Sequence, residues 1–308
     1  EQWLDRPDIL KEDIKMMKKA GINSATLGVF SWSVYEPSEG EYNFGWLTDV
    51  MDNLYENGIY TVLATPSGAR PAWLDEKYPE AMRVDNYGHR NHHGFRHNHC
   101  MSSPVYREKV SNIIHKLVEN AGSHPGLVMW HISNEFGGEC YCPLCVKRFQ
   151  DYLADKFDND ISKLNHAWWN TFWSHNYNSF SQIEPPFANG EISSLGLDLE
   201  WKRFTTWNMT DYMKSEISIL KELTPGIPVT TNFMQMYGGL DYHVMAKELD
   251  VVSWDSYPAL HNQWETFTES MEGNSFDHAI LRSMKKDKPF MLMESAPGLV
   301  NWQQYNKV

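Results

Sequence analysis

Six short, continuous apolar runs set narrow limits on how this 308-residue chain can fold. They occupy residues 25–30, 60–65, 127–133, 228–233, 251–254 and 290–293. Strands with one exposed face alternate apolar and polar residues, whereas continuous runs are typical of strands that are buried on both faces. We therefore expect a parallel sheet that is covered by helices.

Segments with one apolar face alternate with these runs. Apolar residues recur at helical spacing in 10–17, 46–54 and 110–117, and Gly21 and Gly58 stand after the first two segments. A glycine is a common stop signal for a helix, and here each glycine is followed by an isoleucine that opens the next strand region. The pattern predicts a repeated helix-to-strand unit.

Two α/β folds use such units, the (β/α) barrel and the doubly wound sheet. No G-x-G-x-x-G pattern or phosphate-binding loop follows any of the runs, so the usual nucleotide-binding motif of an open sheet is missing. We expect a TIM (β/α)8-barrel. Because barrel enzymes carry their functional groups at the carboxyl ends of the strands, the residues after each run are the candidates for a site.

The charge balance argues against nucleic-acid and membrane partners. The chain has 40 acidic and 27 basic side chains, a net charge of −13, and no basic run that would attract a phosphate backbone. It has no stretch of about 18 apolar residues, and its first residues do not have the pattern of a signal peptide. We expect a cytoplasmic protein. The aromatic content of 14% fits either a large core or a site that stacks on sugar rings.

Two glutamates follow apolar runs directly, Glu135 after the third and Glu294 after the sixth. A carboxylate at a buried strand end is costly unless it has a partner or a task. Two carboxyl groups that face one cleft supply the acid and the nucleophile or base of glycoside hydrolysis, and their separation decides between retention and inversion. The alternative is that one or both glutamates pair with an arginine in a structural network. Of a catalytic pair, the glutamate in less polar surroundings is the acid, and the sequence leaves open which one that is.

Further motifs extend over the full length of the chain: EQW at 1–3, FSW at 30–32, EP at 36–37, WHISNEFG at 130–137, FWS at 172–174, SWDSYP at 253–258 and ME at 293–294. In these motifs the chain resembles the glycoside hydrolase family 42 β-galactosidases. They belong to the clan of retaining glycosidases on (β/α)8 barrels, in which the acid/base follows strand four and the nucleophile follows strand seven. The resemblance implies that Glu135 is the acid/base and Glu294 the nucleophile.

The resemblance also implies a set of substrate-binding residues. Asn134 would hydrogen-bond the sugar 2-hydroxyl, and Arg96, in a long loop over the barrel mouth at about 70–99, would contact the substrate. Trp173 and Trp302 match aromatic residues that line the galactose subsite, and Tyr257 sits where the clan orients its nucleophile.

The same resemblance bears on domain organisation. Residues 1–308 are expected to form the catalytic barrel domain in part, from about strand two to strand seven. The first and last strands, an oligomerisation domain and a small β domain would lie outside this sequence, and the complete protein is expected to be a homotrimer.

Four cysteines form the last pattern. Cys140, Cys142 and Cys145 lie within six residues, and Cys100 is the only other cysteine. Disulfides would need an oxidising compartment, whereas four thiolates suit a tetrahedral Zn²⁺. The spacing leaves both readings open, and the resemblance favours zinc, because several family members hold zinc with this quartet. Four thiolates leave no open position for water, so the implied ion is structural and would clamp the loop of Arg96 to the segment after Glu135. No organic cofactor is expected.

From the sequence and the resemblance we expect a retaining exo-β-galactosidase that acts on terminal, non-reducing β-D-galactosyl residues. Two alternatives remain. One is an α-L-arabinopyranosidase, because that sugar has the same ring without the hydroxymethyl group. The other is a zinc-stabilised carbohydrate-binding scaffold without turnover, which needs neither glutamate.

Overall fold

A computed structural model of the chain describes residues 3–191, 194–258 and 265–296. All six predicted strands are present, and the fourth is divided at Thr231 into two short pieces. The strands are β1 (Ser24–Leu27), β2 (Tyr60–Ala64), β3 (Leu127–His131), β4 (Val229–Thr230), β5 (Asn232–Phe233), β6 (Val252–Ser256) and β7 (Phe290–Ser295).

The strands pair in the order of the chain, and every pair is parallel. One sheet has the order β1-β2-β3-β4 and the other β5-β6-β7. The sheets curve around a common interior, since Thr26 Oγ1 of β1 lies 3.8 Å from Met293 Sδ of β7 although these strands are not paired. Consecutive parallel strands with helical connections form the wall of a (β/α) barrel. The predicted fold class is confirmed, as a barrel portion with six strand positions.

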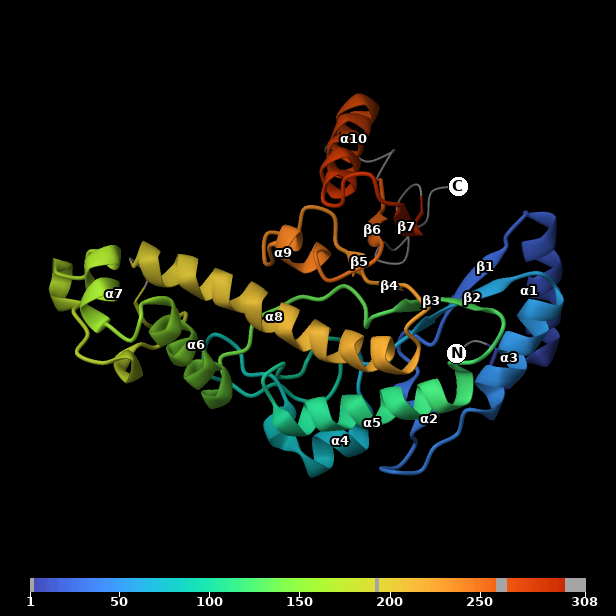
Figure 1. Cartoon of the computed structure of the whole chain (residues 1–308), viewed down its shortest axis with the longest axis horizontal. Coiled ribbons are helices and arrows are strands. Elements are labelled where there is room, and N and C mark those ends of the chain that lie inside the picture. Colours follow the sequence, from blue (N-terminus) through green and yellow to red (C-terminus); the bar gives the residue numbers. More distant parts are fainter. Residues whose placement is uncertain (1–2, 192–193, 259–264, 297–308) are drawn as a thin grey trace.

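Helices cover the outside of this wall (Figure 1). The helices are α1 (Pro7–Lys19), α2 (Trp32–Tyr35), α3 (Gly45–Glu56), α4 (Ala72–Lys77), α5 (Pro104–Ala121), α6 (Pro143–Lys156), α7 (Ile161–Trp168), α8 (Leu195–Leu223), α9 (Tyr242–Ala246) and α10 (Phe267–Ser283). Short 3₁₀ turns lie at Pro79–Ala81, Phe172–Ser174 and Phe180–Gln182.

The three predicted helical segments correspond to α1, α3 and α5. Pro7 starts α1, where its missing N–H costs nothing. The side chain of Ser103 caps α5 by accepting a hydrogen bond from the backbone nitrogen of Tyr106 at 3.2 Å. Gly21 and Gly58 follow α1 and α3 with φ of 74° and 75°, the left-handed conformation that favours glycine.

Two apolar clusters hold the molecule together. The larger lies between the strands and α1, α3, α5 and the second half of α8. The smaller contains the four cysteines with residues of α6, α7 and the first half of α8. Figure 1 shows the long helix α8 joining these regions: α6 and α7 pack around one end of α8, and the strands lie near its other end.

Residues 70–99 do not form the plain long loop that we expected. They contain α4 and the turn at Pro79–Ala81, and isolated bridges join Met82 to His99 and Val84 to Arg90. The helix α4 has fewer than two turns, so the sequence shows no sustained helical period there. The bridges fold the segment back on itself and carry Arg96 toward the strand ends.

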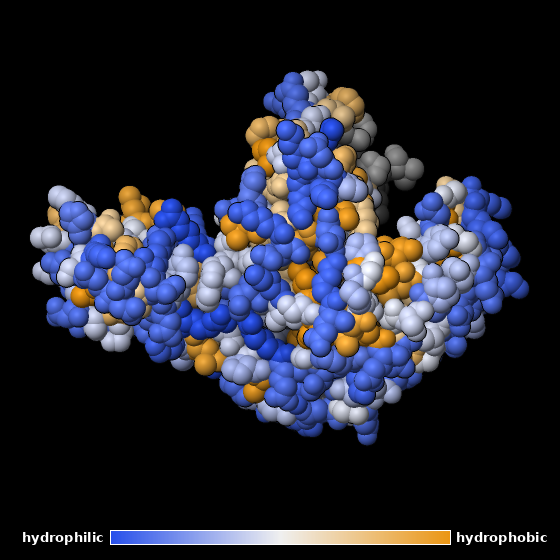
Figure 2. Space-filling model, in the orientation of Figure 1, coloured by the Kyte–Doolittle hydropathy of each residue, from blue (hydrophilic) through white to orange (hydrophobic). Residues whose placement is uncertain are grey.

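Apolar side chains are exposed beside the last helix and strand. Phe267, Met271 and Phe276 of α10 and Phe290 and Leu292 of β7 are all more than two-fifths exposed. Figure 2 shows a largely hydrophilic surface with apolar residues gathered in the recess between α10 and the α1–α3 side of the molecule. Among the described residues, no helix has the length and apolar character needed to cross a membrane.

Candidate active site

The carboxyl ends of β3, β5, β6 and β7 converge on one cavity. It has a volume of about 360 Å³ and is lined by Arg96, Glu135, Met234, Gln235, Asp255, Tyr257 and Glu294. Ligand pockets commonly have volumes of roughly 300–1,000 Å³. The structure therefore brings together both predicted glutamates, although they are 159 positions apart in the sequence.

Glu135 reaches the cavity from a backbone that is held in an uncommon conformation. Its φ is 38° and that of Ser133 is 54°, in the left-handed region that non-glycine residues seldom occupy. Two buried side chains hold this turn: Thr65 Oγ1 accepts from the Ser133 nitrogen at 2.7 Å, and Asn232 Oδ1 accepts from the Glu135 nitrogen at 2.8 Å. Such conformations persist only where the surroundings fix them, and they concentrate at functional sites.

Asn232, on β5, is fully buried and links the strand ends. Its Nδ2 donates to Asp255 Oδ2 at 2.8 Å and to Glu294 Oε1 at 3.1 Å, and it also lies 3.1 Å from Asn134 Oδ1. Its Oδ1 is 3.0 Å from His131 Nε2. Burial lowers the pKa of His131 to about 4, so this ring is neutral near pH 7 and donates from Nε2. From β5, Asn232 thus fixes groups at the ends of three other strands, β3, β6 and β7.

Glu294 is held from two sides. Asn232 Nδ2 donates to Oε1, and the Tyr257 hydroxyl donates to Oε2 in a very short hydrogen bond. Burial and then this bond to Glu294 raise the pKa of Tyr257, which keeps its proton available for donation. These two donors fix the orientation of the Glu294 carboxyl group.

Arg96 contacts Glu135, and Asn134 lies between Arg96 and Glu294. Arg96 Nη1 lies 2.5 Å from Glu135 Oε2. When the Asn134 amide is oriented so that its oxygen accepts from Arg96 Nη1 at 2.9 Å, its nitrogen is 3.3 Å from Glu294 Oε1. Glu135 therefore does pair with an arginine, but this pair lines the cavity together with Glu294 and is not part of a remote structural network.

A third carboxyl group, that of Asp255, completes the cluster. Carboxyl oxygens of Glu135, Asp255 and Glu294 all lie within 4.8 Å of one another. Burial, followed by contact with Glu135 and the charge of Glu294, raises the pKa of Asp255 far above its ordinary value. The cavity thus holds carboxyl groups in different environments, as acid–base chemistry requires.

The predicted aromatic site residues differ in whether they line the cavity. Tyr257 lines the cavity, whereas Trp173 is exposed, stacks on Phe172 and is not among the cavity-lining residues. Trp302 lies outside the described residues. The sequence placed Asn232 and Asp255 among the candidates at the ends of the apolar runs but gave neither of them a role. Their position at strand ends was the available signal.

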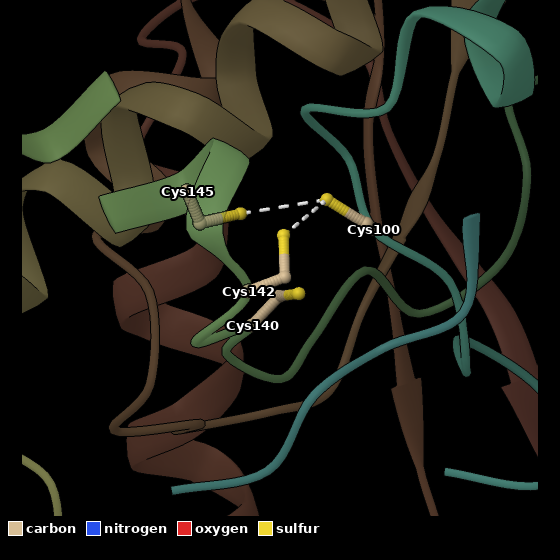
Figure 3. Close-up of side chains that lie close together, drawn as sticks. All are labelled: Cys100, Cys140, Cys142 and Cys145. Carbon is tan, nitrogen blue, oxygen red and sulfur yellow. Dashed lines mark hydrogen bonds between the residues drawn. The ribbon is translucent and has the colours of Figure 1, made fainter. Parts of the chain in front are cut away.

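The four cysteines form a separate, buried cluster. Cys100 Sγ lies 3.3 Å from Cys142 Sγ and 3.5 Å from Cys145 Sγ, and all four sulfurs are within 4.8 Å of one another. Figure 3 shows the four side chains close together: Cys140 and Cys142 lie on the segment before α6, Cys145 lies on α6, and Cys100 lies on a separate coil segment that faces them. The thiols are free. Four sulfurs each about 2.3 Å from one ion are about 3.8 Å apart, so the cluster is compatible with a metal ion.

A larger surface groove, of about 770 Å³, lies elsewhere. It is lined by residues of α6, α8, α9 and the loop before α9, and by no strand-end residue. The smaller cavity is the better candidate site because it alone of these two contains the clustered carboxyl groups.

Comparisons with known proteins agree with this geometry. The family model of glycoside hydrolase family 42, described as beta-galactosidase, matches residues 1–308. Beta-galactosidase Pbg of Clostridium perfringens is 51% identical over 100% of this chain and 45% of its own length. Beta-galactosidase GanA of Bacillus subtilis is 50% identical over 100% of this chain and 46% of its own length.

Solved structures give the same result. The structure of a catalytic mutant of Gan42B, a GH42 beta-galactosidase from G. stearothermophilus, superposes with a TM-score of 0.96 at 51% identity, covering 99% of this chain and 46% of that chain. The chain therefore spans about half the length of the relatives that it matches.

Proposed function

The chain belongs to glycoside hydrolase family 42, the β-galactosidase family, and from this premise we propose that residues 1–308 are the catalytic barrel part of a retaining exo-β-galactosidase. The substrate class is a small β-galactoside with a terminal, non-reducing β-D-galactosyl residue. The names of the relatives support this proposal.

One observation carries the mechanism: the carboxyl oxygens of Glu135 and Glu294 approach within 4.8 Å across a cavity of about 360 Å³. Retaining glycosidases have carboxyl groups about 5–5.5 Å apart, whereas inverting enzymes leave about 6.5–9.5 Å for a water molecule. The spacing supports double displacement with retention.

In the first half of the reaction, Glu294 attacks the anomeric carbon while Glu135 gives its proton to the glycosidic oxygen. The carbon–oxygen bond of the leaving group breaks, and an ester bond to Glu294 forms. In the second half, Glu135 removes a proton from a water molecule that attacks the same carbon, and the ester bond to Glu294 breaks. Tyr257 and Asn232 fix the orientation of the Glu294 carboxyl group, and Arg96 and Asn134 contact the substrate.

We assign the cysteine cluster to a structural Zn²⁺ with Cys100, Cys140, Cys142 and Cys145 as ligands. Four thiolates close the coordination shell, so the ion would supply folding energy and no reactive water. It would join the end of the 70–99 segment, which carries Arg96, to the chain between Glu135 and α6. This would hold Arg96 near Glu135. Free thiols in such a cluster suit a reducing, cytoplasmic compartment, and we propose that localisation.

A homotrimer is proposed for the complete protein on the family resemblance. Light scattering on the complete protein would measure its mass in solution, and a monomer would contradict the proposal. A net charge of −13 makes nucleic acid a poor partner.

The proposed function is tested by replacing Glu294 with alanine in the complete protein. We expect kcat on a nitrophenyl β-galactoside to fall by several orders of magnitude, with partial recovery when azide is added, because azide can attack the anomeric carbon in place of the missing carboxylate. Glu272→Ala on the exposed side of α10 is the matched control and should retain its activity. Unchanged turnover of Glu294→Ala would refute the assignment. Parallel rates on the nitrophenyl α-L-arabinopyranoside separate the two sugar specificities.

A further inference from the structure

Asp255 has an unusual environment for an acidic side chain. It lies near the end of β6, with only 2% of its surface exposed, between the strands that carry Asn232 and Glu294. Its Oδ2 accepts a hydrogen bond from Asn232 Nδ2 at 2.8 Å. Its Oδ1 is buried and has no donor among the described residues.

Apart from Asn232 Nδ2, the groups close to this carboxyl group include two further carboxyl groups, which are acceptors when ionised. Carboxyl oxygens of Glu135 and Glu294 lie within 4.8 Å of it, and Arg96, the cation of the site, reaches Glu135. An ionised Asp255 would place an unsatisfied, charged oxygen in a buried site beside other carboxyl oxygens, which is costly. Carboxyl groups so arranged share protons.

We propose that Asp255 is a positioning residue that keeps its proton through the reaction and donates a hydrogen bond from it to Glu135. The inference rests on the proposed glycosidase function. After the leaving group departs, Glu135 has lost its proton and must act as a base. A hydrogen bond from the Asp255 hydroxyl stabilises that anion and fixes its direction. The proton on Asp255 is never transferred, so the proton balance of the two half-reactions is unchanged.

The electrostatic surroundings agree. Burial, then contact with Glu135, then the charge of Glu294 raise the pKa of Asp255, and the bond from Asn232 opposes them. The titratable and charged groups around it come from several elements: Glu135 and His131 from β3 and the turn after it, Glu294 from β7, Arg96 from the 70–99 segment, Tyr242 from α9, and Tyr257 next to β6. Of these groups, His131 is neutral and the two tyrosines keep their protons, because burial lowers the pKa of the histidine and raises the pKa of each tyrosine.

Two substitutions in the complete protein test the proposal through the pH dependence of kcat/KM on a nitrophenyl β-galactoside. Asp255→Asn keeps a neutral group of the same shape with a donor. We expect its kcat/KM within about threefold of the wild type, with the alkaline limb unmoved. Asp255→Ala removes the donor. We expect kcat to fall about 10- to 100-fold and the alkaline limb to move up by roughly one pH unit, because the anion of Glu135 has lost a hydrogen bond. Asp155→Asn on the exposed face of α6 is the control.

Two kinetic outcomes would overturn the proposal. If the alkaline limb of the kcat/KM profile shifts to lower pH in Asp255→Asn and activity falls tenfold or more, Asp255 acts through a negative charge and is not protonated. If activity falls in both variants while neither limb moves, its role is structural. Thermal unfolding checks that each variant is folded.

An infrared measurement needs neither turnover nor the alanine variant. The difference spectrum of wild type minus Asp255→Asn at neutral pH should show a protonated carboxyl band and no carboxylate band. A carboxylate band would refute the proposal, and so would loss of the protonated band on addition of Mg²⁺, since the cluster would then be a cation site. If the wild type cleaves no galactoside, the proposed function fails, whereas the infrared result still decides the protonation state of Asp255.

Discussion

Replacement of Asn232 by alanine removes the buried side chain that connects the strand-end carboxyl groups. The variant loses the donor to Glu294 Oε1 (3.1 Å), the donor to Asp255 Oδ2 (2.8 Å) and the acceptor for the Glu135 backbone nitrogen (2.8 Å). A hydrogen bond to a charged group contributes about 1.5–3 kcal/mol. For Glu294 alone, this corresponds to a loss of about 10- to 150-fold in rate if the bond aims the attacking carboxylate.

The same substitution also affects stability. The backbone N–H of Glu135 would be left buried without a partner, at a cost of about 1–3 kcal/mol, and the turn with positive φ at Ser133 and Glu135 would lose one of its two supports. We expect the free energy of unfolding to fall by about 2–4 kcal/mol.

The assay combines kcat and KM on a nitrophenyl β-galactoside with urea unfolding of the complete protein. Asn53→Ala, at an exposed position of α3, is the matched control and should change stability by no more than about 0.5 kcal/mol. A folded Asn232→Ala variant with kcat within about threefold of the wild type would refute the argument that Asn232 aims Glu294.

Three further predictions concern other parts of the molecule. A zinc chelator should lower the Tm of the wild type by several degrees and leave the Tm of Cys145→Ser unchanged, because only the intact cysteine quartet holds the ion. Equal Tm shifts in the wild type and the variant would contradict the assignment. Gly28→Ala should lower the free energy of unfolding by about 2–4 kcal/mol, because φ is 78° and the new Cβ would lie 2.2 Å from the Tyr35 hydroxyl. Gly40→Ala is the control: φ is 81° and the space is open, so in the same urea titration it should lose only the free energy of backbone strain. Burial raises the pKa of Glu216, whose ordinary value is 4.5. The native state therefore binds this proton more tightly than the unfolded state, and the free energy of unfolding of the wild type should fall as pH rises above 4.5. The Glu216→Gln variant should not show this decrease with pH. If the unfolding free energies of the wild type and Glu216→Gln differ by the same amount at every pH, the carboxyl group is not protonated in the native state.

The sequence predicted the strands well because each is a continuous apolar run, a signal that does not depend on tertiary contacts. It missed the break at Thr231, whose side-chain hydroxyl donates to the Ile132 carbonyl at 2.7 Å. It also missed α4, which is too short to show a period. These features depend on contacts between distant segments.

The candidate site was predictable in part for the same reason. Glu135 and Glu294 stand at strand ends, and the parallel strands bring those ends together. Asn232 and Asp255 stand at strand ends too, but a single asparagine or aspartate at the end of an apolar run does not reveal that it is buried among carboxyl groups. Trp173 was predicted from resemblance alone, and only the fold shows that it is exposed and not among the cavity-lining residues.

Covalent labelling tests the central claim most directly. The complete protein is incubated with a 2-deoxy-2-fluoro-β-galactoside that carries a good leaving group, and the labelled peptide is identified by mass spectrometry. If Glu294 is the nucleophile of a double displacement, one fluorosugar becomes attached to each active site at Glu294, and activity is lost in parallel. Absence of a covalent adduct, or an adduct on another residue, would contradict the account.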